Sequence, residues 1–156
     1  MFYKDLEQKV VYIAESFEVY HSGREMDFTV FKSENIDIHH IFPASYCEKQ
    51  KYNKNLWNSV VNKTPITYST NREIGGVAPS VYLSRIEKSG KVTTPELEKY
   101  VSTHWIDISC CRSDDFNGHI ISRAKMILSA IEKATGKTIS GKDSEEVIKS
   151  FGQTLS

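Results

Sequence analysis

Two adjacent histidines in a short apolar run constrain this chain more than any other feature of its sequence. The run reads Asp37-Ile38-His39-His40-Ile41-Phe42-Pro43. Isoleucine and phenylalanine favour strands and proline ends them, so the sequence predicts a β-strand from about residue 35 to residue 42. Successive strand residues point to opposite faces, so Asp37 and His39 share a face and His40 lies on the other. The two imidazoles can therefore differ in purpose: one can bind a metal ion while the other accepts a proton.

A histidine pair alone is more often a pair of hydrogen-bonded core residues, and two asparagines downstream favour a functional interpretation. The sequence of residues 58–67 predicts a strand and a turn. The strand is expected at Val60 to Lys63 and contains Asn62. Residues 69–76 predict a short helix that contains Asn71, with Ser69 or Thr70 as its cap and glycines at its end. The sequence thus predicts a hairpin followed by a helix, with a polar residue on each element.

Taken together, these elements resemble the HNH endonucleases, whose ββα-metal motif is a hairpin closed by a helix. The segments DIHHIFP, NSVVNKTPIT and TNREIGGVAPSVYL, followed by HWID and SDDF, are similar to the HNH domain at the C-terminus of GmrSD-like restriction and phage-defence proteins. The similarity extends to Lys137 and so covers most of the chain. The chain departs from the HNH pattern at its third position, where Asn71 replaces histidine, a variant common among HNH enzymes.

This resemblance implies a metal-dependent endonuclease that hydrolyses DNA phosphodiester bonds and leaves 5′-phosphate and 3′-hydroxyl ends. His40 would be the general base, and Asn62 would brace the loop and help to position it. One divalent metal ion would be held by His39 and Asn71, with Asp37 as a further ligand. An asparagine oxygen suits Mg²⁺ or Mn²⁺, while an imidazole also admits Ni²⁺ or Zn²⁺. The alternatives are structural: Asp37 could cap a turn or orient a histidine, and Asn62 could be an ordinary turn residue.

The charge distribution is compatible with a polyanionic partner, although the net charge is not. Twenty basic and twenty acidic residues give a formal net charge of zero, which is unusual for a nucleic-acid-binding protein. Residues 1–42 contain four basic and eight acidic residues, whereas residues 43–72 contain five basic residues and one acidic residue. We expect the five basic residues of the second segment to face DNA phosphates, with a merely solvated surface as the alternative. They are Lys49, Lys51, Lys54, Lys63 and Arg72.

Amphipathic patterns predict helices on both sides of the motif. The expected helices are at Tyr3 to Tyr20, Pro79 to Ile86, from Thr93 or Thr94 onward, from the Ser113-Asp114-Asp115 cap to Gly136, and around Ser144 to Phe151. The polar segment 44–58 is expected to be an ordered loop with helical turns. The predicted fold class is therefore α+β and mostly helical, with a hairpin-plus-helix motif wrapped by α-helices. One domain is expected over residues 1–156, with the motif core at about 35–76 and helical flanks at 3–20 and 79–151.

Cellular location and cysteine usage are also constrained by the sequence. No apolar run approaches the roughly 20 residues of a membrane span and no signal peptide is indicated, so we expect a cytoplasmic protein without membrane contact. The three cysteines contain no CxxC pair, and we expect reduced thiols instead of a structural zinc site. They are Cys47, Cys110 and Cys111.

Two classes of function follow from the sequence. The first is an active nuclease, and the alternative is a catalytically inactive HNH-fold module that binds nucleic acid or docks a partner domain. GmrSD-like proteins also have an N-terminal sensing domain, and no segment of this sequence resembles one. The resemblance therefore implies that the chain is a fragment of a larger protein or acts with a partner subunit.

Overall fold

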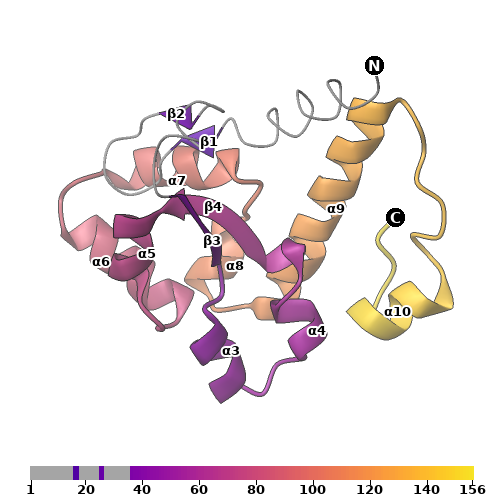
Figure 1. Ribbon diagram of the computed structural model, residues 1–156, viewed down its shortest axis with the longest axis horizontal. Coiled ribbons are helices and arrows are strands. Elements are labelled where there is room, and N and C mark those ends of the chain that lie inside the picture. The colour runs from indigo at the N-terminus through magenta and orange to yellow at the C-terminus, as the bar shows by residue number, and fades with distance from the viewer. Residues whose placement is uncertain (1–15, 18–24, 27–35) are drawn as a thin grey trace.

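The computed structural model of the 156-residue chain describes residues 16–17, 25–26 and 36–156 (Figure 1). This part is mostly helical, with two small antiparallel strand pairs. The first pair joins β1 (Ser16–Phe17) to β2 (Glu25–Met26). The helix predicted from Tyr3 to Tyr20 is therefore wrong at Ser16–Phe17, because these residues pair with a strand nine residues away that a local helical pattern cannot register. The rest of that predicted helix lies outside the described residues.

The second strand pair is the hairpin that the histidine run predicts. β3 (Ile36–His40) runs antiparallel to β4 (Lys63–Thr67), with His39 opposite Thr64 and His40 opposite Lys63. The predicted second strand at Val60 to Lys63 is displaced, because the 3-10 helix η1 (Val60–Asn62) precedes β4. Pro65 lies within β4, opposite Ile38. A strand in a two-stranded sheet has a free edge, so the missing N–H of a proline need not break the ladder.

The connection between the two strands is ordered and contains short helices, as predicted. α3 (Ala44–Lys49) and α4 (Lys54–Trp57) lie one after the other, and the side chain of Asn53 caps α4 by accepting a hydrogen bond from Asn55 N. Cys47 in α3 and Trp57 in α4 are buried and anchor the connection to the core. The connection therefore brings the chain back beside the end of β3.

α5 (Tyr68–Ile74) follows β4 without a loop and completes a strand–strand–helix unit. Its N-cap is Thr67, whose side chain accepts a hydrogen bond from Thr70 N, so the caps predicted at Ser69 or Thr70 are placed two or three residues too late. The helix ends at Gly75, as predicted, with a φ of 60° that glycine adopts without a Cβ clash. α5 contacts both strands of the hairpin.

In the ranges that the structure describes, five further helices lie around this unit. They are α6 (Pro79–Lys88), α7 (Thr94–Thr103), α8 (Ile108–Arg112), α9 (Phe116–Thr135) and α10 (Glu145–Phe151). Figure 1 shows the hairpin in the middle, with α5 and α6 to one side and α9 to the other. The buried core extends from the end of β3 through α6 and α7 to the first half of α9, at Phe42, Leu83, Leu97, Val101, Phe116 and Ile120. None of the helices in the described ranges is long and apolar enough to cross a membrane.

The two ends of α9 agree with the sequence, although one aspartate of its predicted cap has another role. Asp115 caps α9 by accepting from Gly118 N, and Gly136 ends that helix. Asp114 has a different role, because its carboxylate accepts from the backbone N and the hydroxyl of Ser80, at the start of α6. The starts of α6 and α9 are thereby joined.

Candidate functional site

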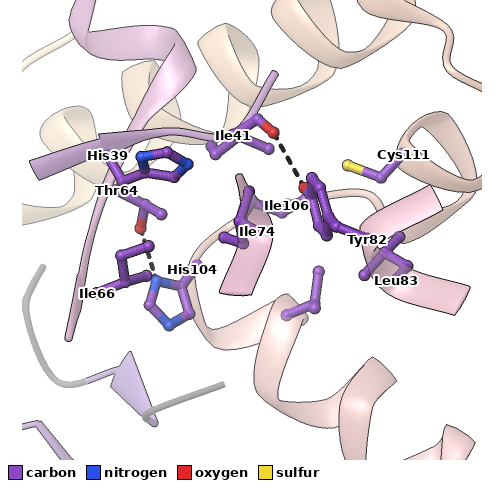
Figure 2. Close-up of a pocket in the computed structure, with 11 residues that line it drawn as sticks. His39, Ile41, Thr64, Ile66, Ile74, Tyr82, Leu83, His104, Ile106 and Cys111 are labelled. Carbon is purple, nitrogen blue, oxygen red and sulfur yellow. Dashed lines mark hydrogen bonds between the residues drawn. The ribbon is translucent and has the colours of Figure 1, made fainter. Parts of the chain in front are cut away.

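The two histidines at the end of β3 have different surroundings, on opposite faces of the hairpin. His39 lines a small cavity whose wall includes Thr64 and Ile74 (Figure 2). The His40 ring lies against Trp57, with ring centroids 5.7 Å apart and an edge-to-face angle of 63°. Its Nε2 is 3.1 Å from Asn58 Oδ1. The alternation expected of a strand is therefore present, and each imidazole meets a separate set of neighbours.

Asn62 is completely buried and hydrogen-bonded through both ends of its side-chain amide. Its Oδ1 accepts from Phe42 N at 2.9 Å, and its Nδ2 donates to Phe42 O and Trp57 O, each at 2.9 Å. Its own carbonyl accepts from Ile41 N at 2.8 Å. The sequence predicted Asn62 in the second strand, but the structure places it in η1, just before that strand. From that corner it holds the two residues that directly follow His40.

The structure describes the side chain of Asn71, a candidate metal ligand, but only the backbone of Asp37. Asn71 is half-buried in α5, three residues before Ile74, which lines the same cavity as His39. Asn71 itself is not among the residues that line this cavity. The backbone of Asp37 pairs with Ile66, while its side chain lies outside the described residues. In the described part of the chain, no three histidine, cysteine, aspartate or glutamate side chains form a metal-binding group.

The cavity beside His39 is small and largely apolar. Its volume is about 20 Å³, which is enough for one water molecule. Figure 2 shows Thr64 between His39 and His104, and Thr64 Oγ1 lies 2.6 Å from His104 Nδ1. On the other side of the cavity, the hydroxyl of Tyr82 donates to Ile41 O at 3.0 Å. The side chains of His104 and Tyr82 thus bond to β4 and to the residue that follows β3.

The five candidate phosphate-binding residues lie on three segments around the hairpin. Lys49, Lys51 and Lys54 are exposed on the α3–α4 connection. Lys63 is half-buried directly opposite His40, and Arg72 is exposed on α5. Three of the five therefore lie on the same connection, Lys63 is opposite His40, and Arg72 lies on a separate element.

The cysteines are free thiols with raised pKa values. Burial raises the pKa of Cys47 to about 12, with a smaller contribution from Glu48. Burial is also the largest cause of the raised pKa values of Cys110 and Cys111. A nucleophilic cysteine needs a thiolate, and the raised pKa values oppose its formation at neutral pH.

Several residues of this site were not identified from the sequence. Asn58 and Trp57 were assigned only to a polar loop with aromatic anchors, although both contact His40. Arg123 on α9 is buried and donates to backbone carbonyls of η1 and β4. Arg123 lies three residues after Ile120 and four before Ile127, a spacing that places it on the apolar face of the helix and could have identified it as a buried cation.

Comparisons with known proteins give one weak relationship. No protein-family model matches the chain, and no solved structure matches it. The chain is 28% identical over 141 residues to "Uncharacterized protein MJ0686" of Methanocaldococcus jannaschii. The match covers 74% of this chain and 24% of that protein. The chain therefore spans about a quarter of the length of this curated relative.

Proposed function

We propose that this chain is a metal-dependent HNH endonuclease domain that hydrolyses phosphodiester bonds in DNA. The order β3, β4, α5, with His39 and His40 at the end of the first strand and Asn71 in the helix, supports this proposal. The observation that carries most weight is the buried Asn62 amide. It holds the backbone of Phe42 from both sides and so provides the brace that the resemblance to HNH enzymes requires.

His40 is the candidate general base in this proposal. Its ring is only half-buried, so water can approach it, and Trp57 and Asn58 restrict its orientation. When Asn58 Oδ1 accepts a hydrogen bond from Nε2, the proton of the neutral ring is on Nε2, and Nδ1 remains to take a proton from water. A positioned imidazole of this kind typically contributes ~10²–10⁴ to a rate.

His39 and Asn71, with Asp37 as a further candidate, would hold the metal ion. In this proposal an imidazole nitrogen of His39 and the amide oxygen of Asn71 would be the donors, a set that fits Mg²⁺ or Mn²⁺ and also admits Ni²⁺ or Zn²⁺. A bound ion would neutralise charge on the phosphate and stabilise the departing 3′ oxygen, so the products would carry 5′-phosphate and 3′-hydroxyl ends. Lys49, Lys51, Lys54, Lys63 and Arg72 would bind the phosphates that flank the cleaved bond.

The wider setting of this activity is also part of the proposal. A restriction or phage-defence role in the cytoplasm follows from the resemblance to GmrSD-like proteins, with target recognition supplied by a sensing domain or partner subunit. The match to a quarter of a longer curated relative is compatible with a domain that functions within a larger protein.

Plasmid cleavage with a panel of divalent metal ions tests the proposal. We expect the wild-type chain to nick or linearise plasmid DNA with Mg²⁺ or Mn²⁺ and to lose this activity in EDTA. His40→Ala should abolish cleavage and keep the fold and the metal affinity. Cleavage by His40→Ala within about tenfold of wild type would remove His40 from the role of base.

Calorimetry separates the metal ligands from the base. Asn71→Ala and His39→Ala should weaken Mn²⁺ binding, and higher Mn²⁺ should partly restore the activity of Asn71→Ala. Unchanged affinity in both variants would place the ion elsewhere. DNA binding without cleavage under every metal would instead identify the chain as an inactive HNH-fold binding module.

A further inference from the structure

Arg123 in α9 is a buried cation whose hydrogen-bond acceptors are backbone carbonyls. The residue is 5% exposed. Its Nη1 donates to Val61 O and to Lys63 O at 2.7 Å each, and lies 3.3 Å from Val60 O. Its Nε donates to His104 O at 3.3 Å. No carboxylate forms an ion pair with Arg123 within the described ranges of the chain.

A buried charge without a counterion opposes folding, so its hydrogen bonds must compensate for lost hydration. Burial lowers the pKa of Arg123 to about 10, which still leaves the guanidinium protonated at neutral pH. The carbonyl oxygens of Val60, Val61 and Lys63 converge on one nitrogen of this group. Carbonyl dipoles that point at one place repel each other, and a cation between them removes that repulsion. Arg123 therefore stabilises the tight path of the backbone from η1 into β4.

This path contains Asn62, which lies between the two carbonyls that Arg123 binds at 2.7 Å. The Asn62 carbonyl accepts from Ile41 N, and its side chain holds Phe42. Arg123 therefore holds the backbone on both sides of Asn62, and the hydrogen bonds of Asn62 in turn reach the two residues after His40. One turn earlier on α9, the His119 ring packs on the Phe42 ring, with centroids 5.0 Å apart.

We propose that Arg123 is a positioning residue for the candidate base: it fixes the η1–β4 corner from which Asn62 sets the position of His40. The inference rests on the proposed nuclease function, and it assigns to α9 a part that lies outside the hairpin-plus-helix motif. Arg123 itself does not touch the substrate. Its effect reaches the reaction through the placement of the imidazole.

A cleavage experiment separates this role from a general contribution to stability. Arg123→Met keeps much of the side-chain length and removes the charge and the donors. Ile120→Ala is the matched control, because Ile120 is buried on the same helix, 1% exposed, and has no polar side-chain atom. Kinetics are measured well below the melting temperature of both variants, at saturating metal ion. We expect Arg123→Met to lower kcat by about 10²-fold with KM within twofold, since a small misplacement of a reacting group has that effect.

The control and the conservative variant complete the test. Ile120→Ala should keep kcat within threefold of wild type even when it is the less stable protein. Arg123→Lys, which keeps a charge near the carbonyls, should recover at least tenfold of the kcat lost in Arg123→Met. Equal loss of kcat in Arg123→Met and Ile120→Ala, or a loss confined to KM, would overturn the inference.

A second readout needs no nuclease activity. The side-chain amide protons of Asn62 should be protected from hydrogen exchange in the wild-type chain. Arg123→Met should reduce this protection by more than tenfold relative to Ile120→Ala and should shift the ring resonances of His40. Unchanged protection and resonances would refute the inference even if the wild type cleaves DNA. Changed protection in a protein that cleaves no DNA would refute the nuclease proposal and leave the structural coupling standing.

Discussion

Asn62 holds the backbone of Phe42 from both sides, with Oδ1 accepting from Phe42 N and Nδ2 donating to Phe42 O, each at 2.9 Å. The second Nδ2 proton is donated to Trp57 O. One buried amide thus fixes the end of β3 relative to the α3–α4 connection. The amide therefore holds the backbone that follows His40 and the backbone of Trp57, whose ring lies beside His40.

Replacement of Asn62 should lower stability strongly. Asn62→Ala removes three hydrogen bonds and should lower the free energy of unfolding by about 3 kcal/mol, at roughly 1 kcal/mol for each bond. Asn62→Asp keeps the size but places a carboxylate oxygen beside two carbonyls, so it should be at least as destabilising. Urea denaturation at pH 7 measures both values. An Asp variant as stable as wild type would show that the amide nitrogen does not donate to these carbonyls.

Asn58 should matter for cleavage and little for stability. Its side chain is exposed and its Oδ1 lies 3.1 Å from His40 Nε2. Asn58→Ala releases the ring and should lower the cleavage rate by about 10- to 100-fold, with a change in unfolding free energy within about 0.5 kcal/mol. Asn55→Ala on the neighbouring α4 is the control and should cleave like wild type. Equal rates in the two variants would mean that Asn58 does not orient the base.

The lysines of the α3–α4 connection should contribute to DNA affinity through counterion release. Each phosphate contact changes the log–log slope of affinity against salt by about −0.9, so the double variant Lys51→Ala/Lys54→Ala should flatten the slope by up to about two. Lys133→Ala/Lys137→Ala removes the same charge at the far end of α9, away from α3 and α4 in Figure 1. Filter binding or fluorescence anisotropy gives both slopes. The connection does not face DNA if the two double variants have the same slope.

His119 should make the protein less stable in acid. The residue is fully buried, and neither ring nitrogen has a hydrogen-bond partner in the described part of the chain. Burial, with a smaller contribution from Arg123, lowers the pKa of His119 from 6.5 to about 3. Below pH 6.5 the unfolded chain therefore binds a proton that the folded protein does not, so stability falls as the pH falls toward 3.

His119→Leu isolates this effect, because it keeps the apolar packing and removes the titrating ring. Between pH 7 and pH 5, wild type should lose about 2 kcal/mol of unfolding free energy relative to His119→Leu. Denaturant titrations at the two pH values measure the difference, and other titrating groups cancel in the comparison. A parallel loss in both proteins would contradict the lowered pKa.

Local patterns predicted most of the helices and the strand β3, because each depends on residues close in sequence. Capping and apolar spacing give α7, with its Thr93–Glu96 capping box, and α9 up to Gly136. The apolar residues of α9 are only partly buried, since Ile131 is 37% exposed where the helix extends past the core. The cysteines were correctly expected to be free thiols.

The parts that local patterns missed depend on partners far away in the chain. β4 begins three residues later than predicted, at a corner where Arg123 binds Val61 O across 62 positions of sequence. Ser16–Phe17 form a strand because Glu25–Met26 are beside them. The proposed roles of His39, Asn71 and Asp37 remain predictions that the metal experiments above will decide.

The separation of Arg123 from Val61 also has a consequence for synthesis. A ribosome adds about 5 to 20 residues per second, so Arg123 is made about 3 to 12 s after Val61. During that interval the hairpin sequence exists without the guanidinium that binds its corner. A nascent chain would therefore acquire the full set of hydrogen bonds at this corner only after α9 has been made, so the surroundings of His40 would be completed late in synthesis.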